Sequence, residues 1–121
     1  MKKNLYRQLI IDLYQSPHNF GKIEKPDYQA LVFNPFCGDS IKMQIKIDDK
    51  RKIKEIKFLG QGCAISIASA SLLTDYLKGK SLEEINKLTK EKVLALLGID
   101  LSPVRLKCAL LPLEALKKSC Q

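Results

Sequence analysis

The chain has 121 residues, of which 45% are hydrophobic, and its 21 Lys and Arg residues against 13 Asp and Glu residues give a formal net charge of +8. This length is typical of one domain, so we expect a single domain over residues 1–121. No apolar run approaches the roughly 20 residues that span a bilayer, and the first residues lack the apolar segment of a secretory signal. These features predict a cytoplasmic protein without a membrane span.

The N-terminal part combines a helix with a loop. Apolar residues recur at i and i+4 over residues 3–15, which predicts a helix that ends before Pro17. Residues 16–27 contain two prolines and a glycine and predict a loop. His18, the single histidine of the chain, falls in this loop. A surface position is therefore favoured over a catalytic role for this side chain.

Three strands are expected next, over residues 29–33, 41–47 and 53–59. Ile41, Met43 and Ile45 alternate with polar or charged residues, which is the period of a strand with one buried face. A charged turn over residues 48–52 joins the last two strands. The pattern predicts an antiparallel meander whose second face is basic and wet.

The remainder of the chain is helical. A run of small residues between positions 64 and 71 predicts a helix that packs closely on a neighbour, and this helix should end at Gly79. Further helices are expected to begin with a capping box at residues 81–84, to run from Thr89 to Gly98, and to begin at Ser102 and Pro103. Pro112 should kink the last helix or mark where it effectively begins. The expected fold class is α+β, a three-stranded antiparallel sheet with an N-terminal helix and a C-terminal group of helices packed on one face.

Four cysteines, at positions 37, 63, 108 and 120, carry the chemical signal. The absence of a C-x-x-C pair excludes a local zinc knuckle and a thioredoxin-type redox pair. Cys37, Cys63 and Cys108 each lie near a junction between predicted elements. If these junctions meet at one end of the sheet, three thiolates and the nearby Asp39 form a site that suits zinc or iron–sulfur chemistry. Cys120 stays unassigned, and a frayed terminal thiol is the favoured interpretation.

The charged residues support two smaller predictions. Arg105 and Lys107 flank Cys108 and should favour its thiolate form. The basic residues are spread along the whole chain and only 7% of the residues are aromatic. A solvated basic surface, or a docking face for an acidic protein, is therefore favoured over nucleic-acid binding.

The segment Gly60–Gly62 does not continue into a nucleotide-binding G-x-G-x-x-G pattern.

Three segments resemble the cysteine motifs of the IscU/NifU/SufU family of iron–sulfur assembly proteins. They are Asn-Pro-Phe-Cys-Gly-Asp at residues 34–39, Gly-Gln-Gly-Cys-Ala-Ile-Ser at residues 60–66, and Arg-Leu-Lys-Cys-Ala at residues 105–109. The stretch over residues 5–21 is similar to the N-terminus of the same family. The resemblance covers nearly the whole chain, and the family fold agrees with the fold expected from periodicity.

The resemblance implies a scaffold rather than an enzyme. Such a protein takes sulfur from a cysteine desulfurase, assembles a transient [2Fe–2S] cluster and passes it to apo-proteins. Cys37, Asp39, Cys63 and Cys108 match the metal and cluster ligands of the family. Cys108 matches the usual sulfur-accepting thiol, with Cys37 as its rival in SufU-type members, and Asp39 matches the residue that keeps the cluster labile.

The sequence also departs from both subgroups. Lys107 stands where IscU and NifU carry a histidine, as it does in SufU, yet the SufU insertion before Ser102 is missing. Residues 101–105 differ at two positions from the chaperone-binding Leu-Pro-Pro-Val-Lys segment of IscU, so recognition by that dedicated chaperone is not expected. The alternatives are a SufU-like, zinc-dependent sulfur-transfer protein that activates a cysteine desulfurase, and a structural zinc domain used only for docking.

Overall fold

The computed structural model describes residues 2–35 and 38–121. In this part of the chain the sheet has the order β1-β2-β3, and both strand pairs are antiparallel. The α+β fold class predicted from the sequence is confirmed. The elements are α1 (Lys2–Gln15), β1 (Tyr28–Asn34), β2 (Asp39–Ile47), β3 (Ile53–Gln61), α2 (Ala64–Leu77), α3 (Glu84–Lys87), α4 (Lys90–Leu97) and α5 (Pro103–Ser119).

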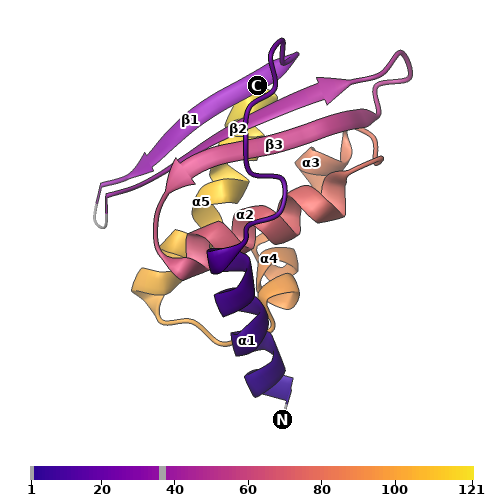
Figure 1. The fold of residues 1–121 in the computed structure, drawn as a ribbon. Helices are drawn as coiled ribbons and strands as arrows, with labels where there is room; N and C mark the ends of the chain where they lie inside the picture. Colours follow the sequence, from indigo (N-terminus) through magenta and orange to yellow (C-terminus); the bar gives the residue numbers. More distant parts are fainter. Residues whose placement is uncertain (1, 36–37) are drawn as a thin grey trace.

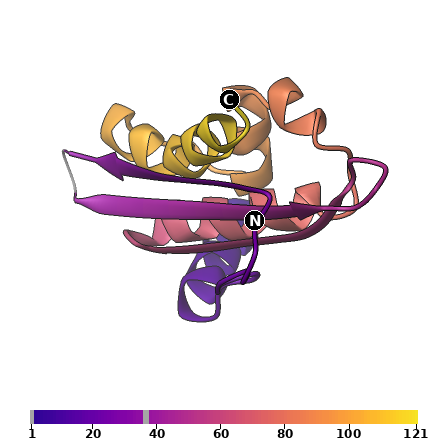
Figure 2. The same cartoon turned by 90° about the horizontal axis from the view of Figure 1, so that it is seen from above.

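The helices lie on one face of the sheet (Figure 1). Helix α5 packs against β1 and β2, α2 packs against β3, and α1 packs on α2. Seen from above, α5 lies towards β1 and α1 towards the β3 side (Figure 2). Ile41, Met43 and Ile45 of β2 point into this core and are fully buried, as their alternation predicts. In the described residues, no helix is both long and apolar enough to cross a bilayer.

Helix α2 is the central helix of the molecule. Ser66, Ala68, Ser69, Ala70 and Ser71 are all buried in it, because α1, α4, α5 and β3 surround it. Small side chains allow the backbones to approach so closely that a side chain of α2 reaches the main chain of α5. The hydroxyl of Ser69 donates a 2.7 Å hydrogen bond to the carbonyl of Ala109. The close packing predicted for this segment is confirmed.

The second face of the sheet differs from the prediction. Gln44 points to that face but is only 6% exposed, because the segment at residues 19–27 covers it. The Gln44 side-chain carbonyl accepts a 2.8 Å hydrogen bond from the backbone of Ile23, which is itself buried. The same segment pairs with the edge of β3, where Gly21 donates to the carbonyl of Phe58 at 2.9 Å. The prediction of a wet basic face is therefore wrong over this part of the sheet.

Most predicted helix ends are confirmed, but two details differ. Thr89 accepts a hydrogen bond from the backbone of Lys92, and Ser102 accepts one from Arg105. The predicted capping box at residues 81–84 is wrong, because the backbone around Ser81 pairs with the start of β3 and the short α3 begins only at Glu84. Helix α5 begins at Pro103 and runs through the buried Pro112 to its end, so Pro112 does not mark its start.

His18 and Asn19 tie the N-terminal loop to α2. The Asp75 carboxylate accepts hydrogen bonds from His18 Nδ1 at 2.7 Å and from Asn19 Nδ2 at 2.8 Å. Asn19 Nδ2 also donates to the Thr74 hydroxyl at 2.8 Å. Burial opposes ionisation of Asp75, but the hydrogen bonds from His18 and Asn19 outweigh it and lower its pKa. We name His18, Asn19 and Asp75 the loop clamp.

Candidate metal centre

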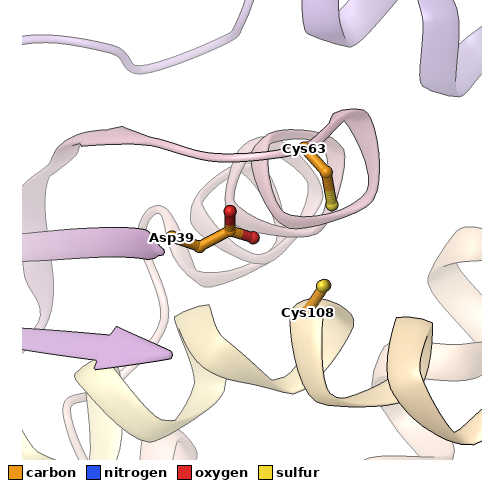
Figure 3. A group of neighbouring side chains, drawn as sticks. All are labelled: Asp39, Cys63 and Cys108. Carbon is orange, nitrogen blue, oxygen red and sulfur yellow. The ribbon is translucent and has the colours of Figure 1, made fainter. Parts of the chain in front are cut away.

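Three separate segments bring potential metal ligands together at one end of the sheet. Asp39 is the first residue of β2, Cys63 directly precedes α2, and Cys108 lies in α5. One carboxylate oxygen and the two sulfur atoms all lie within 4.8 Å of one another. The two cysteine side chains face each other across a gap, and the Asp39 carboxylate points into it from the side (Figure 3).

The backbone of each segment fixes its ligand. Asp39 pairs with Asn34 at the end of the β1–β2 ladder. Cys63 is the N-cap of α2 and has an extended backbone, with φ −76° and ψ 170°. Its side chain therefore lies at the N-terminal end of α2, beside the backbone N–H groups of the first turn. Cys108 directly precedes Ala109, whose carbonyl accepts the hydrogen bond from Ser69 of α2. This contact between α2 and α5 therefore also holds Cys108 near Cys63.

The turn before Cys63 needs glycine for steric reasons. A Cβ atom on Gly60 would lie 2.2 Å from the carbonyl oxygen of Ser40. A Cβ atom on Gly62 would lie 2.3 Å from Ser66 Oγ and 3.0 Å from Asp39 Cγ. These distances are far below normal contact, so the turn approaches β2 and α2 too closely for any side chain. Gly60 and Gly62 thus serve to bring Cys63 to Asp39.

The ligands differ in their exposure and contacts. Asp39 and Cys108 are each 5% exposed, whereas Cys63 is half-buried. The hydroxyl of Ser66, which is fully buried, lies 3.2 Å from Asp39 Oδ2. Sequence reasoning missed Ser66. Its spacing of three residues from Cys63 was the available signal, because residues three apart at the start of a helix face the same way.

This set of donor atoms fits both metal centres considered from the sequence, a zinc ion and an iron–sulfur cluster. In tetrahedral coordination two sulfur ligands at about 2.3 Å from one ion lie about 3.8 Å apart. The three ligand atoms lie within 4.8 Å of one another, so the group must close by at most about 1 Å to bind a single ion. Two thiolates and a carboxylate supply three of the four ligands of tetrahedral Zn²⁺. Thiolates are also the usual ligands of iron–sulfur clusters. Cys37, the fourth expected ligand, lies outside the described residues.

Arg105 and Lys107 are exposed and diverge from one another on α5. Arg105 lines a pocket of about 360 Å³ together with Arg7 and Ala64, the residue that follows Cys63. Lys107 lines a different pocket, of about 240 Å³, together with Phe33. Their expected effect on the Cys108 thiolate stays a prediction.

Cys120 lies apart from the three ligands. It is the C-cap of α5, twelve residues after Cys108, which is about 18 Å along a helix axis. The thiol is half-buried against the core, and this burial raises its pKa. A freely frayed terminal thiol, as expected from the sequence, does not describe this packed side chain.

Comparison with known proteins agrees with the motifs. The chain is 39% identical to the iron–sulfur cluster assembly scaffold protein IscU of Haemophilus influenzae, over 93% of this chain and 90% of the relative. It is 40% identical to the iron–sulfur cluster assembly enzyme IscU of Drosophila melanogaster, over 93% of this chain and 74% of the relative.

The fold is shared with solved structures. A crystal structure from Fervidobacterium islandicum, described as a candidate scaffold for iron–sulfur cluster assembly in the SUF system, superposes with a TM-score of 0.82. It is 27% identical in sequence, and the match covers 94% of this chain and 95% of that one. The profile of the NifU-like N terminal domain matches residues 5–121. The chain therefore belongs to the NifU-like N-terminal domain family, as its three cysteine motifs suggest.

Proposed function

We propose that this protein is an iron–sulfur cluster assembly scaffold, which receives sulfur from a cysteine desulfurase, holds a nascent [2Fe–2S] cluster and passes it to apo-proteins. The observation that carries the proposal is the convergence of Asp39, Cys63 and Cys108 from three segments of the chain. Relatives named as IscU scaffold proteins support it. Within this proposal the protein acts as a carrier and not as an enzyme.

The proposed cluster ligands are Cys37, Asp39, Cys63 and Cys108. Three thiolates hold the soft iron–sulfur unit firmly, whereas a carboxylate oxygen is a poorer and more exchangeable ligand. An acceptor protein can therefore replace the Asp39 oxygen first. Transfer needs such a weak position, because four equally strong ligands would keep the cluster on the scaffold.

Sulfur arrives in the proposed mechanism as a persulfide. A cysteine thiolate of the scaffold attacks the terminal sulfur of the desulfurase persulfide. The S–S bond of the desulfurase breaks, its cysteine leaves as a thiolate, and a new S–S bond forms on the scaffold. A two-electron reductant then converts this sulfur to sulfide. We propose Cys108 as the acceptor, with Cys37 as the alternative, although Cys108 is only 5% exposed and needs movement of its neighbours for the attack.

The cytoplasm is the proposed compartment. Three of the four proposed ligands are cysteines, and cysteine thiols remain reduced in the cytoplasm. Arg105 and Lys107 are exposed beside the site. We propose that these cations stabilise the thiolates during sulfur transfer.

Anaerobic reconstitution tests the function. The protein is incubated with cysteine, a cysteine desulfurase, ferrous iron and a reductant, and absorption and Mössbauer spectra are recorded. A stoichiometric [2Fe–2S] cluster that passes to apo-ferredoxin is the expected result. A colourless protein that retains one zinc ion and accelerates the desulfurase would contradict the scaffold proposal and would instead identify a SufU-like sulfur carrier.

A matched pair of cysteine variants tests the site. Cys63→Ser removes one proposed ligand at almost unchanged volume, and we expect it to abolish the stable cluster. Cys120→Ser makes the same change at the other end of α5, and we expect parental cluster yield. Equal cluster yields from both variants would contradict the proposed site. A separate measurement identifies the sulfur acceptor: mass spectrometry after thiol alkylation locates the persulfide on Cys108 or on Cys37.

A further inference from the structure

Ser66 is a buried hydroxyl that contacts two of the three convergent ligands. Its Oγ lies 3.2 Å from Asp39 Oδ2, 3.0 Å from the carbonyl oxygen of Cys63 and 3.9 Å from Cys63 Sγ. The side chain is fully buried in the first turn of α2. The proposed cluster chemistry assigns no role to this hydroxyl. Ser66 is neither a proposed cluster ligand nor a proposed sulfur acceptor, yet it contacts the site.

The two nearest acceptors for the single hydroxyl proton are the Asp39 carboxylate and the Cys63 carbonyl. An ionised carboxylate forms stronger hydrogen bonds than a neutral carbonyl. The low dielectric around these buried groups strengthens that preference. With Asp39 ionised, as metal ligation requires, the Ser66 hydroxyl donates to Asp39 Oδ2.

The surrounding backbone maintains this contact. Ser66 and Asp39 both lie against Gly62, where a Cβ atom would be 2.3 Å from Ser66 Oγ and 3.1 Å from Asp39 Oδ2. In the described part of the chain, Ser66 is the one hydrogen-bond donor to the Asp39 carboxylate. Oδ2 is thus held by α2, whereas Oδ1 accepts no hydrogen bond from the described residues.

We propose that Ser66 is a positioning residue that holds the Asp39 carboxylate by one oxygen, so that the other is presented to the metal as a single, pre-oriented ligand. This inference rests on the proposed function of the site, because it takes Asp39 as a ligand. Without the hydroxyl, Oδ2 loses its donor in a buried place and the carboxylate can rotate. Both changes weaken ligation of the metal.

The test uses Co²⁺ as a spectroscopic probe, since its thiolate charge-transfer absorption reports ligation without any cluster assembly. The affinity of the full-length reduced protein for Co²⁺ is measured for the parent, Ser66→Ala and Ser66→Thr. Loss of a hydrogen-bond partner next to a metal ligand costs 10- to 100-fold in affinity, and we expect about a tenfold loss for Ser66→Ala. Ser66→Thr retains the hydroxyl and should recover most of the affinity.

Ser119→Ala is the matched control. Ser119 is also a buried serine whose hydroxyl bonds a helix carbonyl, that of Leu116 at 2.6 Å, but it lies at the far end of α5. We expect its Co²⁺ affinity to equal that of the parent. Alanine is a better helix former than serine, so both variants should fold, which far-ultraviolet circular dichroism verifies.

A double-mutant cycle separates positioning from a general structural role. In an Asp39→Ala background, Ser66→Ala should cause no further loss of Co²⁺ affinity, because its effect acts through the carboxylate. The same loss in both backgrounds would overturn the proposal, and so would an undiminished affinity in Ser66→Ala. A failure of the proposed function is distinguishable: parental Co²⁺ affinity in Cys63→Ser would show that these residues are not the metal site.

Discussion

Asp39, which contacts the first turn of α2, and Asp75, which lies in its last turn, are two aspartates that the fold treats differently. Asp75 belongs to the loop clamp, and its two oxygens accept hydrogen bonds from His18 and Asn19 at 2.7 and 2.8 Å. In the described residues, the Asp39 carboxylate accepts one hydrogen bond, at 3.2 Å from Ser66, and lies beside two thiols. A carboxylate that fixes a loop has both oxygens engaged, whereas one that serves as a ligand keeps an oxygen available.

The exposure and the neighbours of the two carboxylates also differ in line with these two roles. Asp75 has 41% of its side chain exposed, and its negative charge is balanced by protein donors. Asp39 is 5% exposed, and the thiols of Cys63 and Cys108 are its neighbours. A buried carboxylate needs a compensating positive charge or further donors. A metal ion between Asp39, Cys63 and Cys108 would supply that charge, whereas Asp75 needs none.

The strongest disturbance of this contrast should come from Gly62→Ala. The added methyl group overlaps Ser66 Oγ and Asp39 Cγ, so the turn, α2 or β2 must shift. Overpacking of this kind costs about 2 kcal/mol in the free energy of unfolding, which urea denaturation measures. Co²⁺ affinity should fall as well, because Cys63 and Asp39 move apart. Unchanged stability and affinity would contradict the close packing of this turn.

Exchanging each aspartate for alanine should separate the two roles. We expect Asp39→Ala to slow decay of a reconstituted cluster about tenfold, which corresponds to about 1.4 kcal/mol in the barrier, because the exchangeable oxygen ligand is gone. Asp75→Ala should leave the decay rate unchanged. The rates are read from the loss of visible absorption in the presence of apo-ferredoxin. A cluster on Asp39→Ala that decays as fast as that of the parent would disprove this role for Asp39.

The smallest effect is the pH dependence of the loop clamp. The pKa of Asp75 is lowered, since hydrogen bonds from His18 and Asn19 and the nearby charges of His18 and Lys78 outweigh its burial. The ionised carboxylate therefore stabilises the fold above its ordinary pKa of about 3.9, and this contribution is lost as the pH falls through the lowered value. Asp75→Asn should cost about 1 kcal/mol at pH 7. The difference from the parent should shrink below about pH 4 in urea denaturation, and a difference independent of pH would contradict the clamp.

Sequence periodicity was sufficient for the framework of the fold. The alternation around Met43 depends only on which face is buried, and the ends at Thr89, Gly98 and Ser102 depend on local backbone chemistry. The predicted helix cap at Ser81 was wrong, because long-range pairing of this segment with the start of β3 overrides a local capping signal. The covered face at Gln44 was missed for a similar reason, since no local pattern indicates that a distant loop will cross a sheet.

The convergence of Asp39, Cys63 and Cys108 was predictable from the sequence, but the contacts that support these residues were not. Glycine and proline near Cys37 and Cys63 marked junctions, and a shared site followed if the junctions met. The close contact of Ser66 with Asp39 depends on the turn at Gly62 bringing β2 and α2 together. Such a contact between residues 27 positions apart has no signature in the sequence.

The hydrogen bond between Ser69 and Ala109 has a thermodynamic consequence, because it joins the helix that begins after Cys63 to the helix that carries Cys108. Unfolding of either helix separates Cys63 from Cys108, so a metal ion held at the proposed site would bind the native state far better than the unfolded chain. At a free concentration 100 times its dissociation constant, such a ligand adds about 2.7 kcal/mol of stability by mass action. Cargo release thus returns the carrier to its less heat-resistant form, and melting temperature becomes a direct gauge of how much of the protein is loaded.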